Sequence, residues 1–423
     1  MRGDQTSKVI ALFPWGDVIE EFLDPIGLEL QDFAERMTGG WLFGYAAALG
    51  SAGHKPIIVC ASERVNRIEC YEHSGTGTPI WVAPAKRPRQ GHSPAAYSLR
   101  RWSATPLSAF REILCRSKCD LLLAQEYEYT RFDALAWLAR GLDLPLYATF
   151  QGGDRTLSWV EAAARRLSLR ACRGLIVASS AERERLARAY PRIAPNIANI
   201  PNPVATQEWQ AMDRSEARAI LGLPRDCFIV VNHGRIDIRR KGLDVLLKAW
   251  ERFAGASACR LVIIGSGQDN DAFAKLVRAS ELENVQWLSG YMTDRTLIRR
   301  WLSAADVYVT ASRIEGMPVA PLEAMACGLP VIASDAQGLP DILVGGEASG
   351  GLMVAQEQPE EIAWALARLK DDGVLRARLG AAARRRVMEK FSIEAVGAAL
   401  DEFLTTAQVR ITSGRDTRRA PSR

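Results

Sequence analysis

Two glutamates stand eight residues apart in the stretch "RIEGMPVAPLEAMACGLPVIASDAQGLPDIL", which covers residues 313–343. Between residues 319 and 327 the second of them, Glu323, is the only residue that is not apolar. A helix that is apolar all round is a buried helix. A carboxylate buried there needs hydrogen-bond donors, because an unpaired buried charge is very costly. The hydroxyl groups of a sugar are suitable donors.

The first glutamate, Glu315, lies between the apolar run "ADVYVTAS" and this helix. We expect it in a loop at the carboxyl end of a strand, where open α/β sheets bind ligands. The unpaired N–H groups of the helix N-terminus, between the two glutamates, favour a phosphate. This order suits a ligand with a sugar, a diphosphate and a ribose in sequence. An ion-paired loop glutamate and a core glutamate bonded to a neighbouring strand are the structural alternative.

Two cations, Arg235 and Lys241, occur in "GRIDIRRKG". Arg235 follows the strand-like "FIVVNHG", and Lys241 is expected to start the next helix. Arg235 is therefore placed at the carboxyl end of that strand, where open α/β sheets bind ligands. A solvated basic turn that includes Arg239 and Arg240 is the alternative.

The elements that must position these residues alternate between strand and helix patterns. Apolar runs predict buried strands within residues 8–15, 55–60, 119–125, 144–151 and 172–180, then 227–234, 259–267, 285–290, 305–312 and 330–335. Helical stretches separate most of them, which is typical of parallel sheets covered by helices. The segment 190–209 is rich in Pro and Asn and is expected to be a linker. The sequence thus predicts two doubly wound halves, joined near residue 203, that face a central cleft.

Composition limits the classes of partner. The 423 residues include 54 basic and 49 acidic ones, a net charge of +5 that does not argue for nucleic acid. We see neither a signal peptide nor an 18-residue apolar run. The eight cysteines form no CxxC pair, and no histidine cluster accompanies Cys115 and Cys119, so reduced packing residues are expected. We expect a cytoplasmic protein, with peripheral membrane contact at the inner face as a further option.

The stretch "EGMPVAPLEAMACGLPVIASD" resembles the E-x7-E signature of retaining glycosyltransferases of family 4. Further segments resemble that family in the expected order, among them "GG…LGSAGHKPIIV", "LIVASSAERERL", "HGRIDIRRKGLDVLLKAW" and "LVIIGSGQD". Together these segments span about residues 39 to 400. The resemblance implies the GT-B fold, in which two Rossmann-like domains face a nucleotide-sugar cleft.

The resemblance also implies roles for single residues. Glu315 would bond the transferred sugar, Glu323 the ribose hydroxyls, and Arg235 with Lys241 the diphosphate. The resemblance implies further contacts with the substrate. Gly39 and Gly40 would form a glycine loop near the donor phosphate, and Tyr291 would lie near the base. The other implied contacts are Gly234, Gly316, Met317, Gln151 and Asp154. The implied domains are an acceptor-binding domain at 1–203, a nucleotide-sugar domain at 204–385, a helix at 386–407 that crosses back, and a disordered basic tail at 408–423.

Three departures from the family pattern qualify these roles. Gln151 in "TFQGGD" stands where family members often have a histidine, and glutamine cannot carry a proton. Pro203 in "IPNPV" takes a position where glycine is common and would stiffen the hinge. The segment 126–133, "EYEYTRFD", lies where acceptor loops occur; it would either bond a sugar acceptor or form a polar loop that leads into a helix.

These observations predict a retaining, metal-independent glycosyltransferase that needs no cofactor. Its donor would be a nucleotide-diphosphate sugar, with UDP and GDP favoured, and its acceptor a hydroxyl of a polysaccharide or a lipid-linked glycan. Gln151 motivates an alternative, a non-catalytic GT-B subunit that binds nucleotide or a partner. A sugar-nucleotide epimerase is a third option, which a chain with four histidines fits less well.

Overall fold

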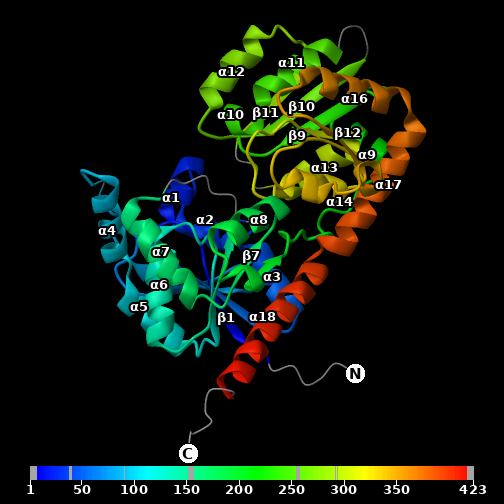
Figure 1. Ribbon diagram of the computed structural model, residues 1–423. Helices are drawn as coiled ribbons and strands as arrows, with labels where there is room; N and C mark the ends of the chain where they lie inside the picture. Colours follow the sequence, from blue (N-terminus) through cyan, green and yellow to red (C-terminus); the bar gives the residue numbers. More distant parts are fainter. Residues whose placement is uncertain are drawn as a thin grey trace, which may run out of the picture. The chain divides into compact units, whose positions relative to one another are not determined.

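The chain divides into two compact units, and each is described here by itself (Figure 1). The computed structural model describes residues 7–37, 41–89, 91–150, 157–253, 258–290, 292 and 294–416, with the backbone alone for 406–416. Unit 1 comprises residues 1–203 and 393–423, and unit 2 comprises residues 204–392. The chain therefore leaves unit 1 after Pro203 and returns to it at Ile393.

Unit 1 is built on an eight-stranded sheet in the order β3-β4-β2-β1-β5-β6-β7-β8. Its strands are β1 (Val9–Phe13), β2 (Lys55–Ser62), β3 (Glu69–Glu72), β4 (Pro79–Pro84), β5 (Leu121–Ala124), β6 (Leu146–Phe150), β7 (Gly174–Val177) and β8 (Ile197–Asn199). Among the described strands of this sheet, β3 alone pairs in the antiparallel direction. The central strands are apolar in continuous runs because both faces of a parallel sheet are covered by helices.

Helices cover both faces of this sheet. The first face carries α1 (Glu20–Leu23), α2 (Leu30–Glu35), α3 (Phe43–Ser51) and α18 (Ile393–Asp416). The second face carries α5 (Leu107–Arg116), α6 (Thr130–Gly141), α7 (Trp159–Ala171) and α8 (Ser180–Ala189). Helix α4 (Pro94–Ala104) packs on α6 and α7. From α18, Val396, Leu400 and Leu404 are fully buried in the first face's core. The last helix of the chain is thus part of the core of unit 1.

Unit 2 contains a six-stranded, wholly parallel sheet in the order β11-β10-β9-β12-β13-β14. Its strands are β9 (Phe228–His233), β10 (Cys259–Gly265), β11 (Val285–Ser289), β12 (Val307–Thr310), β13 (Val331–Ser334) and β14 (Gly351–Val354). Its helices are α9 (Arg214–Ile220), α10 (Ile238–Lys241), α11 (Leu243–Phe253), α12 (Asn270–Ala279), α13 (Arg295–Ala304), α14 (Val319–Ala326), α15 (Leu339–Ile342), α16 (Pro359–Asp371) and α17 (Gly373–Lys390). This strand order is that of a doubly wound nucleotide-binding fold.

Some boundaries differ from those predicted. Residues 386–390 end α17, whose Leu379 is buried in unit 2, so the helix that returns to unit 1 begins at Ile393. Residues 408–416 continue α18, where the sequence predicted a disordered tail; once a helix is nucleated, each added residue gains a hydrogen bond. The expected linker contains β8, which extends the sheet edge beside β7. Among the described residues, no helix combines the length and apolarity needed to cross a bilayer.

Candidate functional site

The order of the second sheet reverses between β9 and β12. These two strands are neighbours, with Val307 opposite Val230 and Tyr308 opposite Val231. From β9 the chain proceeds to β10 on one side, and from β12 to β13 on the other. In open α/β sheets, ligands bind outside the carboxyl ends of the strands at such a switch point. The residues that follow β9 and β12 therefore form the candidate site.

Lys241 and Glu315 meet at this edge of the sheet. Lys241 Nζ donates to Glu315 Oε1 at 2.6 Å. The same carboxylate oxygen accepts from Ser312 Oγ at 2.7 Å, and Ser334 Oγ holds the carbonyl of Ser312 at 2.6 Å. The side chain of Glu315 is 9% exposed and that of Lys241 is 25% exposed. A carboxylate and a cation therefore stand at a defined separation, at the rim of the sheet.

Glu323 is held by a histidine from the neighbouring strand. His233, the last residue of β9, places Nε2 at 2.8 Å from Glu323 Oε2, and the carboxylate is 13% exposed. An ionised carboxylate only accepts hydrogen bonds, so Nε2 carries the proton in this contact. The Arg295 guanidinium lies 3.9 Å from the other carboxylate oxygen. The buried glutamate therefore has partners within the protein.

Aromatic residues enclose His233. The hydroxyl of Tyr308 in β12 donates to the His233 carbonyl at 3.2 Å. Burial raises the pKa of Tyr308, and the charges of Glu323 and Glu315 act in the same direction, so its hydroxyl stays protonated as a donor. Trp209 lies under the Arg295 guanidinium at 5.3 Å. Hydrogen bonding and packing thus fix the backbone at the end of β9.

Backbone segments approach closely around the site. Gly242 follows Lys241 with φ +59°, and a Cβ there would lie 1.9 Å from the Ala311 carbonyl oxygen. Gly265, at the end of β10, has φ +138°, and a Cβ there would lie 1.9 Å from the carbonyl oxygen of Gly234. Glycine has no Cβ and tolerates positive φ, so the loops after neighbouring strands can pack directly together.

Arg313 joins the two loops that carry the site. Its guanidinium makes two hydrogen bonds to Asp244 in α11, both of 2.8 Å, and a further one of 3.1 Å to the carbonyl of Arg239. Its backbone N–H donates to the carbonyl of Arg240 at 2.8 Å. Burial acts to raise the pKa of Asp244, but the hydrogen bonds and charge of Arg313 outweigh it and lower that pKa. Arg313 therefore fixes the Glu315 loop against the segment that carries Lys241.

The structure brings together some, but not all, of the residues that the sequence predicts to bind a nucleotide-sugar donor. The structure pairs Glu315 with Lys241 and places the N-terminus of α14 between Glu315 and Glu323, which lies within that helix. Arg235 is exposed after β9, and no hydrogen bond or ion pair joins it to either glutamate within the described residues. Gly234 is exposed in the same loop, Gly316 is half-buried, and Met317 is buried just before α14. Gly39, Gly40, Gln151, Asp154 and Tyr291 lie outside the described residues.

One local expectation is corrected. Lys241 ends the short helix α10 and does not start the next one, because Gly242 adopts the left-handed conformation and stops α10. Cations near a helix C-terminus are favoured by the helix dipole. The alternative for the glutamates was an ion-paired loop glutamate and a core glutamate bonded to a neighbouring strand. Both contacts occur, because Glu315 pairs with Lys241 and Glu323 with His233 of β9.

The segment 126–133 of unit 1 follows β5 and leads into α6. Tyr127 is buried and donates to Glu182 at 3.0 Å. Glu128 is buried as well and accepts from Arg185 at 2.8 Å. Burial raises the pKa of Glu128, against the opposing effect of Arg185. These side chains bond to α8, as expected for the polar-loop alternative, and Tyr127 does not offer a free face for stacking.

Sequence reasoning missed His233 and Arg313. His233 immediately precedes Gly234 at the carboxyl end of β9, so the rule that selected Arg235 also applies to it. Arg313 directly follows the predicted strand of residues 305–312 and could have been selected in the same way. Its bonds to Asp244 join residues far apart in the sequence, which no local pattern reveals.

Two family models match consecutive parts of the chain. The description "Glycosyltransferase Family 4" matches residues 42–208, and "Glycosyl transferases group 1" matches residues 213–386. The first match ends five residues beyond the boundary between the units, and the second lies wholly within unit 2. Together with the strand order, they show that the chain belongs to glycosyltransferase family 4 and has the GT-B fold.

Relatives and solved structures agree with this assignment. Alpha-maltose-1-phosphate synthase of Mycobacterium tuberculosis is 32% identical over 57% of this chain and 64% of its own length. D-inositol 3-phosphate glycosyltransferase of Kineococcus radiotolerans is 32% identical over 50% of this chain and 52% of its own length. Matches thus span about half to two thirds of these relatives. Sucrose-phosphate synthase of Thermosynechococcus elongatus has a TM-score of 0.72 at 22% identity, covering 95% and 100% of the chains. Anabaena HepE in complex with UDP has a TM-score of 0.71 at 16% identity; the match covers 94% of this chain and 99% of the HepE chain.

Proposed function

We propose that this protein transfers a sugar, with retention of anomeric configuration, from a nucleotide-diphosphate sugar to a hydroxyl acceptor. The contact between Lys241 and Glu315 carries the proposal. It places a cation and a carboxylate at the switch point of a nucleotide-binding sheet, beside the N-terminus of α14. Glu323 stands in that helix with a histidine partner. A sugar, a diphosphate and a ribose can be matched to these groups in this order.

In the proposed reaction the diphosphate leaves as the glycosidic bond breaks. Lys241, which is already close to the site of the sugar, neutralises the developing charge together with Arg235. Protein cations supply this stabilisation, so we propose that no metal is required. The leaving phosphate takes the proton of the acceptor hydroxyl. Glu315 and Glu323 bind hydroxyl groups of the transferred sugar and of the ribose, respectively.

We propose that the donor substrate is a UDP-sugar or a GDP-sugar. One relative in Corynebacterium glutamicum is named as GDP-mannose-dependent, and HepE was solved in complex with UDP-glucose. We assign donor binding to unit 2, because the site described above lies wholly within it. A thermal-shift screen of UDP, GDP and ADP sugars tests this, since a ligand at one hundred times its Kd stabilises by about 2.7 kcal/mol.

The acceptor is proposed to bind unit 1, as a polysaccharide or a lipid-linked glycan. Half-buried aromatic side chains gather beyond the carboxyl end of β1. The ring centroid of Trp15 lies 5.7 Å from that of Phe22, 6.3 Å from that of Trp41 and 5.6 Å from that of Tyr129. The Arg101 guanidinium lies 5.2 Å from the Tyr129 ring. β1 and β5 are neighbours where the order of the first sheet reverses. Aromatic faces beside a cation at a switch point support sugar binding there.

The test of function compares Lys241→Ala and Glu315→Gln with the unchanged protein, once the screen has given a donor. Transfer and donor hydrolysis should each fall at least about tenfold, a change of about 1.4 kcal/mol in the barrier. Lys248→Ala and Glu251→Gln, exposed on α11, are matched controls that should keep full activity. Full activity in both site variants would refute the site. Tight nucleotide binding without any turnover by the unchanged chain would favour a non-catalytic subunit.

A further inference from the structure

Three helices on one side of unit 1 form a continuous outer surface. Trp102 in α4 donates through Nε1 to the carbonyl of Thr130 at the start of α6, at 3.0 Å. Ser98 of α4 and Ser158, the N-cap of α7, place their hydroxyl oxygens 2.9 Å apart. Helices α6 and α7 also pack on each other. The outward side of α4, α6 and α7 is therefore a single face, which we call the outer face.

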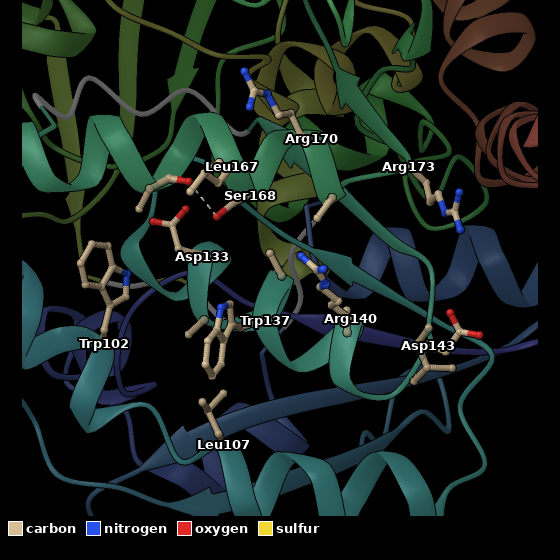
Figure 2. A pocket seen from close by; sticks show the side chains of 16 residues that line it. Trp102, Leu107, Asp133, Trp137, Arg140, Asp143, Leu167, Ser168, Arg170 and Arg173 are labelled. Atoms are coloured by element: carbon tan, nitrogen blue, oxygen red, sulfur yellow. Dashed lines mark hydrogen bonds between the residues drawn. The ribbon is translucent and has the colours of Figure 1, made fainter.

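Large apolar side chains project from this face into solvent. Trp137 on α6 is 81% exposed, and Trp159 and Leu167 on α7 are 76% and 64% exposed. Leu99 on α4 is 56% exposed. A groove of about 830 Å³ runs between α6 and α7, lined by Trp137, Leu167 and small residues such as Ala164 (Figure 2). Single exposed apolar residues are ordinary, but Trp137 and Leu167 line the same groove, and exposed apolar side chains that gather in this way mark an interaction surface.

The exposed charged residues on the three helices of the outer face are all basic, while the groove is also lined by one exposed acidic residue, Asp143. The acidic residues of α4, α6 and α7 are Asp133 and Glu161, and both are buried. Asp133 makes two hydrogen bonds of 3.0 Å to Arg165, and Glu161 accepts from Thr130 Oγ1 at 2.6 Å. The exposed charged residues of the three helices are Arg100, Arg140, Arg166 and Arg170. An exposed acidic side chain, Asp143, follows just after α6.

The spacing on α7 places apolar and basic groups on one stripe. Trp159, Arg166, Leu167 and Arg170 recur at intervals of seven, one and three residues, which at 3.6 residues per turn fall within about 100° of arc. In Figure 2, Trp137, Arg140, Leu167 and Arg170 are seen around the groove. The stripe therefore presents apolar and basic side chains together on one side of α7.

We propose that the outer face docks on an anionic phospholipid surface. Tryptophan rings prefer the headgroup level of a bilayer, and each arginine near an anionic surface adds to the attraction. The charge of the face is complementary to such a surface. The groove between α6 and α7 can receive apolar parts of the lipid while Arg140 and Arg170 meet headgroup phosphates. This inference depends on no residue of the donor site and stands apart from the proposed function.

Vesicle sedimentation of the full chain, without donor or acceptor, tests the proposal. We expect binding to vesicles of phosphatidylcholine with 30% phosphatidylglycerol, weak binding to pure phosphatidylcholine, and loss of binding at high salt, since exposed charges are screened. Trp137→Ser with Trp159→Ser, and separately Arg140→Gln with Arg166→Gln and Arg170→Gln, should each reduce the partition coefficient at least about tenfold. Unchanged circular dichroism and melting temperature would show that both variants fold.

Matched controls come from unit 2. Trp364 is 63% exposed on α16 and Arg278 is exposed on α12, so Trp364→Ser and Arg278→Gln should leave vesicle binding unchanged. The proposal is overturned if the unchanged chain binds neither kind of vesicle, or if the face variants bind as it does, which would place lipid contact elsewhere, such as the basic segment after Gln408. Self-association that disappears with Trp137→Ser would also overturn it, because a second copy would then cover the face.

Discussion

The His233 Nε2 atom lies 2.8 Å from Glu323 Oε2, which joins the last residue of β9 to the middle of α14. Without a ligand, this contact gives the buried carboxylate a donor. It also orients the carboxylate, because His233 is itself held through its carbonyl by Tyr308. His233 is therefore a positioning residue for the proposed ribose contact.

Replacing His233 tests this role. His233→Ala should weaken UDP or GDP binding about tenfold, because a hydrogen bond to a charged group contributes about 1.5–3 kcal/mol. His233→Gln, which offers an amide N–H to Glu323, should retain more affinity than His233→Ala. Calorimetric titration measures both. If the three proteins bind nucleotide equally, while the melting temperature of His233→Ala falls, the histidine has a structural role alone.

A pair of glycines isolates the close approach at the Lys241 turn. Gly242→Ala meets the Ala311 carbonyl oxygen at 1.9 Å, whereas Gly222→Ala, at a similar φ of +65°, meets nothing within 4 Å. The left-handed strain of about 1–2 kcal/mol is common to both. Overlap should make Gly242→Ala less stable by a further 1–3 kcal/mol or so. Urea unfolding gives the difference, and equal midpoints would show that the two loops can separate freely.

Acid stability should depend on Arg313. Arg313 lowers the pKa of Asp244 below the ordinary value of 3.8, so the stabilisation that comes with ionised Asp244 is fully present above about pH 4. It is lost as pH falls through the lowered pKa of the folded protein. Arg313→Met should thus be less stable at pH 7, and the difference from the unchanged protein should shrink toward pH 3. Urea midpoints across this range, with Arg278→Met as control, measure it; a constant difference would contradict the assignment.

The thiols should divide into two reactivity classes. Burial raises the pKa of Cys60, Cys119, Cys172 and Cys327 to about 12, so their thiolate is scarce at pH 8. Cys70 and Cys115 are exposed among the eight free cysteines. A thiol reagent at pH 8 should therefore label two cysteines fast, and the rest after denaturation. Cys115→Ser should leave one fast thiol. Three or more fast thiols in the unchanged protein would show local opening.

The strands that carry the candidate site can be predicted from the sequence, because both faces of a parallel sheet are buried and their sequences are continuous apolar runs. The run before Gly234 and the run before Ser312 became β9 and β12. The prediction misses four strands, β3, β4, β8 and β14. Three of them, β3, β8 and β14, stand at sheet edges and gain their regular structure from pairing with one neighbour. Lys241 is predicted to start a helix but ends α10, since Gly242 stops α10 before α11 begins.

The contacts within the site were less predictable than its location. Glu315, Lys241 and Glu323 could be assigned to one edge of one sheet, since carboxyl ends of parallel strands share that edge. That Lys241 pairs with Glu315 and His233 with Glu323 depends on side-chain packing between segments 74 and 90 residues apart. The outer face also escaped sequence reasoning, because exposed tryptophans and core tryptophans look alike in one sequence.

The return of the chain at Ile393 affects the order in which the protein can fold during synthesis. Val396, Leu400 and Leu404 fill the core of unit 1 but leave the ribosome only after all of unit 2. Unit 2 is continuous in sequence and can close as soon as it is made. Unit 1 must wait with an open apolar seam along α3, and a chain released before residue 393 would carry that seam into the cell, where chaperones and proteases recognise such surfaces.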